Sequence, residues 1–269
     1  MKIKDWENEK DTLHLLSQIL GKYKLEANYQ EPQWSHVTLN INVQGFSTGM
    51  LNYKTHTFSL EVNLLQHQIE IVVDQHINDI DLENGKTIQF YYNQIETILN
   101  QLGINLKINT LPQEVTHPIP FEKDDTHHHY EPKIAEKALD LMKFAYHAEA
   151  NFINSLRVRK SKPGLFWGTF DISCIIVKDK AAPFEDDSKV IERAAFDEEM
   201  IEFGFWFGDE QFEGPTCFVL PYPFADQSFN ADHHFPENSY FDKQLMEFIF
   251  EHAITIMLIL LLNFSKHLI

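Results

Sequence analysis

Several features that would point directly to a function are missing from this chain. Its only cysteines are Cys174 and Cys217, too few for a disulfide framework or for a zinc site built from thiolates. It contains no G-x-x-x-x-G-K-[ST] phosphate loop, no G-x-G-x-x-G fingerprint and no G-x-S-x-G elbow. The sequence therefore gives no direct sign of a nucleotide site or of a serine hydrolase.

Basic residues are scarce as well. Lysine and arginine number 22 against 40 aspartates and glutamates, which gives a formal net charge of −18. The negative electrostatic potential around a protein of this charge repels polyanions, so we expect no nucleic-acid partner. Many of the acidic residues lie between Asp179 and Glu213, where they form either a solvated face or an interaction surface.

No hydrophobic run is long enough to span a bilayer. The longest, Ala253 to Phe264, is shorter than the ~20 residues that a span requires. We expect it to continue a helix that begins near Tyr240, either buried or used as an oligomer contact, so that a homo-oligomer through this C-terminal helix is possible. No secretory leader precedes Trp6, and the low cysteine content suits a reducing compartment, which predicts a cytoplasmic protein.

Apolar periodicity predicts alternating helical and strand-like stretches. A helix capped by Asp11 has Leu13, Leu16 and Ile19 on one face, with His14, Ser17, Gln18 and Lys22 pointing elsewhere. Strand-like alternation follows at residues 37–43, 58–64 and 69–73, and a further helix at 88–102 ends at Gly103. The second half has a long helix after Pro132, strand candidates at Phe203–Phe207 and Cys217–Tyr222, and the helix from Tyr240.

The two halves repeat one order of elements, and Trp34 and Trp167 stand about half the chain length apart. Each tryptophan follows a helix and a proline and opens a strand-like run. We therefore predict an α+β protein with two related lobes, each with helices on one face of an antiparallel sheet, produced by internal duplication. The predicted boundaries are 1–111 for the first lobe, 112–132 for a connection rich in proline and histidine, and 133–269 for the second lobe.

Strand parity places polar groups beside each tryptophan. Trp34 and His36 share one face, and Trp167 and Asp171 share the matching face in the second half. If these faces meet, they line a cleft for a small molecule through Trp34, His36, Trp167 and Asp171. The alternative is that these polar faces are the solvent-exposed faces of antiparallel sheets.

The connection holds a dense set of possible metal ligands. His127 and His129 project to the same side of an extended chain, and His117 with Asp124 or Asp125 can complete a divalent site. The alternative is that these histidines simply titrate in water.

Acid–base chemistry has its own candidates. His14 and His147 have the same separation as the tryptophans, and with His36 and Asp171 they can form a catalytic group. The alternative is that they are hydrogen-bonded histidines at the edge of the core. Five cations end the two helices that precede the tryptophans, and they can bind an anion or simply suit the negative helix termini: Lys22, Lys24, Arg157, Arg159 and Lys160.

Several of these stretches together resemble a bacterial family known only as a domain of unknown function. They are Thr12-Leu13-His14 with Gln18 and Gly21-Lys22, Trp34-Ser35-His36, His117-Pro118-Ile119-Pro120-Phe121, Phe166-Trp167-Gly168-x-Phe170-Asp171, and Gly204-Phe205-Trp206. The resemblance covers nearly the whole chain. It differs at residues 159–165, where the family tends to have a Gly-Lys-x-Ser-Pro-Val-His run, so no role for that histidine passes to this chain.

Three hypotheses for the function remain open. The first is a small-molecule-binding protein that uses Trp34, His36, Trp167 and Asp171. The second is a metal-assisted hydrolytic enzyme, with His14, His36 and Asp171 as catalytic candidates and His117, Asp125, His127 and His129 as metal ligands. The third is an interaction module whose acidic segment and aliphatic C-terminus make oligomer contacts.

Overall fold

The computed structural model describes residues 1–186, 190–209, 211–225 and 237–251. By internal contacts the chain divides into two units. The N-terminal unit comprises Trp6–Phe144 and Gly164–Phe170, and the C-terminal unit comprises Met1–Asp5, Ala145–Pro163 and Asp171–Ile269. Residues 112–132 belong to the N-terminal unit, while the three-part division of the chain drawn from the sequence stays a prediction.

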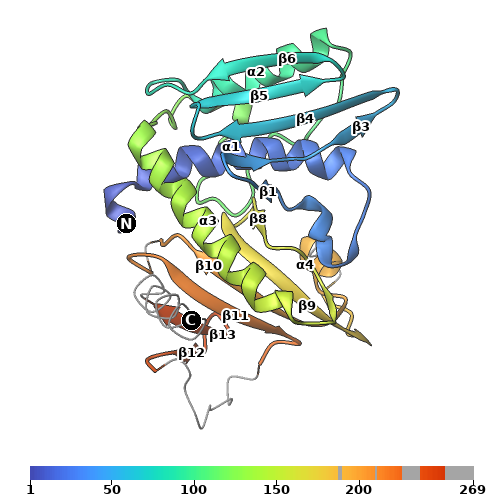
Figure 1. The fold of residues 1–269 in the computed structure, drawn as a ribbon, viewed down its shortest axis with the longest axis vertical. Helices are drawn as coiled ribbons and strands as arrows, with labels where there is room; N and C mark the ends of the chain where they lie inside the picture. Colours follow the sequence, from blue (N-terminus) through green and yellow to red (C-terminus); the bar gives the residue numbers. More distant parts are fainter. Residues whose placement is uncertain (187–189, 210, 226–236, 252–269) are drawn as a thin grey trace, which may run out of the picture. The chain divides into compact units, whose positions relative to one another are not determined.

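The N-terminal unit is an antiparallel sheet with two helices on one of its faces (Figure 1). Its elements are α1 (Glu7–Ala27), η2 (Pro32–Val37), β1 (Asn40–Ile41), β2 (Gly45–Ser47), β3 (Leu51–Tyr53), β4 (His56–Asn63), β5 (Gln68–Val73), β6 (His76–Asp81), α2 (Ile88–Gln101), η3 (Phe121–Lys123), the first part of α3 (Pro132–Asn154), and β8 (Gly164–Phe166). The strands run in the order β1-β2-β4-β5-β6, and β3 pairs with β4. Buried residues alternate with less buried ones along β4 and along β5, and Leu60 of β4 and Ile71 of β5 are fully buried beneath α1 and α2. This two-residue period is typical of a half-buried strand.

Helix α1 lies deeper than its apolar stripe predicts. Every residue from Thr12 to Lys24 is buried, including His14, Gln18 and Lys22. The expectation that these polar residues point away from the core is therefore wrong. A helix that is enclosed on all sides must provide each buried polar group with a partner or leave it for a ligand.

The C-terminal unit is a second antiparallel sheet. Its elements are η1 (Ile3–Asp5), the last part of α3, β7 (Arg159–Lys160), β9 (Asp171–Ala181), α4 (Val190–Ala195), β10 (Glu198–Trp206), β11 (Thr216–Tyr222), β12 (Tyr240–Asp242) and β13 (Glu247–Glu251). The order is β12-β13-β11-β10-β9-β7. Helix α3 packs on one face of this sheet, where the Phe152 ring lies 4.7 Å from the ring of Phe203, centroid to centroid.

Two local predictions about the tryptophans are wrong. Trp34 does not open a strand, because Gln33 and Trp34 have left-handed φ angles of 52° and 56° within η2, a conformation no strand accommodates. Trp167 lies in the turn that follows β8, and this turn ends at Phe170 with a φ of 57°.

The helix expected from Tyr240 is wrong over its described part. Residues 240–242 and 247–251 form the hairpin β12–β13, in which Phe241 pairs with Phe248. Both segments contain aromatic residues, which favour strands over helices. The aliphatic run 253–264, with the oligomer contact expected of it, lies outside the described residues.

The fold class is confirmed as α+β, with two antiparallel sheets that each follow a helix. The internal duplication stays a prediction. Among the described residues, no helix has the length and apolar character needed to cross a membrane.

Candidate functional site

The residues proposed to line a cleft fall in different units. Trp34, His36 and Trp167 belong to the N-terminal unit, whereas Asp171 opens β9 of the C-terminal unit. Of the catalytic candidates, His14 and His36 belong to the first of these units. His147 is exposed on the part of α3 that belongs to the C-terminal unit.

His14 contacts the turn that carries Trp167. Its Nε2 lies 3.1 Å from the carbonyl oxygen of Trp167 and 2.9 Å from that of Gly168. Its ring also stacks on Phe170, with the ring centroids 5.2 Å apart. Because carbonyl oxygens only accept, Nε2 carries the proton and donates to them. Burial lowers the pKa of His14 to about 4, outweighing the hydrogen bond to Gly168, so the ring is neutral at physiological pH.

Gln18 holds a second backbone segment beside His14. Its Oε1 accepts from the Gln113 N–H at 2.8 Å, and its Nε2 donates to the Gln113 carbonyl at 2.7 Å. These two bonds fix which end of the amide is which. The Gln18 amide nitrogen also lies 3.0 Å from His14 Nε2, but both atoms are donors in this arrangement. His14 therefore positions the backbone at Trp167, and Gln18 positions the backbone at Gln113.

Trp167 lies against α1 at its one glycine. A Cβ on Gly21 would stand 2.2 Å from Trp167 Cγ and 2.3 Å from its Cδ1. Only glycine allows the indole to approach the helix this closely. The indole is 2% exposed, and its buried Nε1–H has no hydrogen-bond acceptor among the residues that the structure describes.

Lys22 is the charged group beside this indole. Its Nζ stands 5.6 Å from the centroid of the Trp167 ring, and the residue is only 3% exposed. Burial lowers the pKa of Lys22 to about 8, and Glu26 opposes this only in part. Within the described part of the chain, no hydrogen bond or ion pair is made to the Lys22 ammonium. We call Lys22 and Trp167, with Gly21 between helix and indole, the lysine–tryptophan site.

His36 has a structural environment instead. Its Nδ1 accepts from the Glu31 N–H at 3.1 Å, and its carbonyl accepts from Asn28 Nδ2 at 3.0 Å. Burial lowers the pKa of His36. These bonds fix the left-handed turn after α1, so His36 is used to position this turn.

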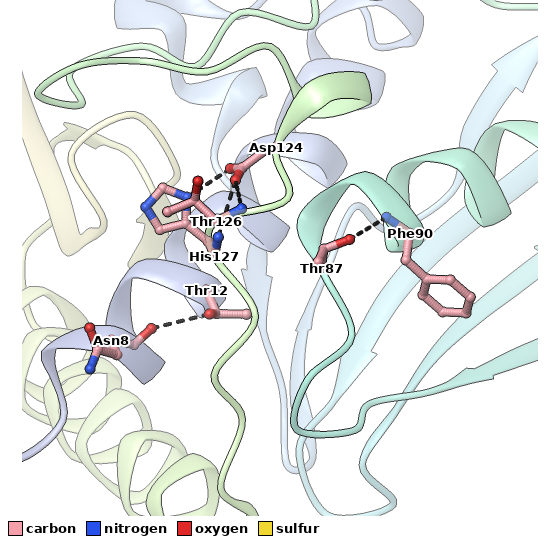
Figure 2. A network of polar contacts seen from close by, with 7 residues as sticks. All are labelled: Asn8, Thr12, Thr87, Phe90, Asp124, Thr126 and His127. Atoms are coloured by element: carbon pink, nitrogen blue, oxygen red, sulfur yellow. Dashed lines mark hydrogen bonds and ion pairs between the residues drawn. The ribbon is translucent and has the colours of Figure 1, made fainter.

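The histidine-rich segment forms an ion pair. His127 Nδ1 lies 2.8 Å from Asp124 Oδ2, and Asp124 Oδ1 also accepts from the backbone N–H groups of Thr126 and His127 (Figure 2). The hydrogen bond that the His127 ring donates to the Asp124 carboxylate raises the pKa of His127. His127 also accepts the Ile88 N–H through its carbonyl, which ties the segment to the start of α2.

The other proposed metal ligands are not gathered around this pair. His128 and His129 stack on each other with ring centroids 4.4 Å apart. Across the described ranges, no group of three or more histidine, cysteine or acidic residues is able to hold a metal ion. The set His117, Asp125, His127 and His129 is therefore not assembled as a metal centre there.

The comparisons with known proteins can now be set beside this geometry. A family of unknown function, DUF5996, matches residues 1–255. The chain belongs to this family. No curated protein and no solved structure gives a significant match. Membership in DUF5996 confirms the nearly full-length resemblance seen in the sequence, and it leaves the function to be argued from the site itself.

Sequence reasoning underestimated Lys22. It lies directly after Gly21, in the same helix as His14 and Gln18, and its neighbours Leu20 and Tyr23 are buried. A lysine inside an otherwise buried stretch is the signal that could have identified it, because lysine is almost never fully buried without a partner.

Proposed function

We propose that this DUF5996 protein binds a small organic carboxylate at the lysine–tryptophan site. The observation that supports the proposal is that the Trp167 indole N–H is buried without an acceptor among the described residues, while the Lys22 ammonium lies over the same ring. An unsatisfied buried donor costs about 1–3 kcal/mol, and a ligand oxygen would remove that cost.

The chemistry of the two donors favours a monoanion. One ammonium balances a single negative charge, and two carboxylate oxygens can accept from an ammonium and an N–H together. The pKa of Lys22, near 8, leaves most of the ammonium protonated at pH 7. An anion would raise this pKa, because opposite charges favour the charged form.

Other residues are assigned supporting roles in this proposal. His14 donates to the carbonyl groups of Trp167 and Gly168, so it holds the turn in place as a positioning residue. Gly21 leaves room for the indole against α1.

The test is titration calorimetry of the full chain with acetate, benzoate and inorganic phosphate. We expect benzoate or acetate to bind more tightly than phosphate, and Lys22→Met to weaken binding about tenfold or more, since a charge-assisted hydrogen bond is lost. Lys86 is a matched control, because its Nζ stands 4.5 Å from the centroid of Phe90, a ring without an N–H donor. Lys86→Met should leave binding unchanged. The proposal is overturned if no carboxylate binds, or if Lys22→Met binds as the wild type does.

A further inference from the structure

A second set of polar groups lies in the C-terminal unit, on the sheet face opposite to Phe203 and α3. Glu202 pairs with Leu220 across β10 and β11. Val219 pairs with Phe248, which places Glu247 beside Leu220 in the same row. Asp242 of β12 pairs with Glu247. Directly paired residues share a face, so Glu202, Leu220, Glu247 and Asp242 form one row, which we call the acidic row.

The acidic row contains a buried carboxyl group that is not fully satisfied. Glu247 is 9% exposed, and its buried Oε2 has no hydrogen-bond partner in the described part of the chain. Burial, with the charges of Glu202 and Asp242, raises the pKa of Glu247 to about 8. Glu202 Oε1 accepts from Ser173 Oγ at 2.6 Å. In the described ranges neither Glu202 nor Glu247 pairs with a lysine or arginine.

Aromatic side chains surround the row on the same face. Phe218 and Phe212 are buried there next to Ile249 and Leu220. Four further aromatic residues pack against them and are only partly buried: Phe196, Trp206, Phe224 and Tyr240. Trp206 stacks on Phe212 with ring centroids 5.7 Å apart. Ring faces of this kind attract cations.

We propose that this face binds a small organic cation, with an ammonium group between Glu202 and Glu247 and its apolar part against the aromatic residues. Glu247 and Asp242 are paired on neighbouring strands, and Glu202 lies in the same row two strands away from Glu247. Like charges held together in this way are unfavourable. A bound ammonium removes the repulsion and donates to the unpartnered oxygen of Glu247.

The surroundings favour an organic ammonium over a metal ion. Ca²⁺ and Mg²⁺ require six or more oxygen ligands or several retained waters, whereas aromatic carbon encloses much of this row. No group of three or more metal ligands occurs in the parts of the chain that the structure describes. An ammonium is satisfied by two carboxylates and the face of a ring.

The test uses the full chain, with benzylamine as the probe and titration calorimetry at pH 7 in phosphate and in HEPES. Binding should release protons, because the ammonium favours the ionised form of Glu247, and the measured heat should therefore differ between the two buffers. Glu247→Gln should weaken binding about tenfold or more and abolish the proton release. Glutamine keeps the size of the buried Glu247 side chain and cannot ionise, so this variant should fold at least as stably as the wild type.

Glu251→Gln is the control. Glu251 lies on the same strand, but its Oε1 already accepts from the Tyr240 hydroxyl at 3.0 Å. This variant should bind benzylamine as the wild type does. The proposal is overturned if benzylamine does not bind, if it binds equally to Glu247→Gln, or if Ca²⁺ binds in its place. It is independent of the carboxylate site in the N-terminal unit, so either proposal can fail alone.

Discussion

The substitution Gly21→Ala is the most direct check on the packing of the lysine–tryptophan site. In an ordinary helix interior, alanine is more favourable than glycine by about 1 kcal/mol. Here the added Cβ would lie 2.2 Å from Trp167 Cγ, far inside the 3.5–4.0 Å contact distance of carbon atoms.

The size of the effect follows from two opposing contributions. The indole is 2% exposed and enclosed, so it cannot move aside freely, and overpacking of this kind costs about 1–3 kcal/mol. Close approach on this scale places the cost at the upper end of the range. After the gain in helix propensity is subtracted, we expect Gly21→Ala to lower the free energy of unfolding by about 2 kcal/mol.

The assay is urea denaturation followed by far-UV circular dichroism, with hydrogen exchange to confirm that α1 is the region affected. The same substitution is then made in a Trp167→Ala background, where the obstructing ring is gone. There Gly21→Ala should increase stability by about 1 kcal/mol, so the sign of the effect reverses. If Gly21→Ala stabilises the protein while Trp167 is intact, the proposed packing of the indole against α1 is wrong.

Three further predictions follow from buried ionisable groups. The Glu149 side chain is buried, and burial, together with the charges of Asp171 and Glu202, raises the pKa of Glu149 well above its usual value. Its contribution to stability is therefore present below about pH 4.5 and is lost as the pH rises through the raised value. Glu149→Gln should accordingly be more stable than the wild type at pH 8 and nearly equal to it at pH 4, as measured by thermal unfolding. Burial raises the pKa of Asp124, but the hydrogen bonds that it accepts from His127 outweigh burial, and its pKa is lowered overall. The contribution of this carboxylate to stability is therefore present above about pH 4 and is lost as the pH falls through the lowered value. Asp124→Asn should cost about 1–3 kcal/mol at pH 6 and lower the pKa of His127 measured by NMR; an unchanged His127 titration would contradict the ion pair. Burial raises the pKa of the Cys217 thiol to about 12, so at pH 8 it should react with a disulfide reagent at least about 100-fold more slowly in the folded protein than in urea.

The matched control for Glu149→Gln is Glu136→Gln. Glu136 lies on the same helix, but its side chain is half exposed, so its removal should change stability by no more than about 0.5 kcal/mol at either pH. If both variants respond to pH alike, the pH dependence does not come from the buried carboxyl group.

The alternation of apolar and polar residues identified the strands that have one buried face and one solvent-exposed face. Strands β4 and β5 and the start of α2 lie within a residue or two of their predicted positions. Period-two burial is a local feature, and so is the turn at Asn84-Gly85 that precedes α2. The α+β class follows from the order of these elements.

The tryptophans show where local patterns are insufficient. Alternation from Trp34 to Val43 predicts a strand, but a left-handed turn fixed by His36 and Asn28 takes its place. The Tyr240 region likewise pairs as a hairpin with β11, and that choice depends on a neighbouring strand distant in the sequence. Tertiary pairing of this kind overrides local propensity.

The sequence by itself determined the fold class, the acidic character of the protein and its resemblance to a family, because each of these depends on composition or on residues close together in the chain. The tertiary structure decided which polar groups lose their water. Lys22 and Trp167 lie far apart in the sequence, and so do Glu202 and Glu247, so no local pattern shows that the members of each pair come together. Whether a buried donor or acceptor finds a partner depends on segments that only folding brings together, and that is why both proposed sites emerged from the packing.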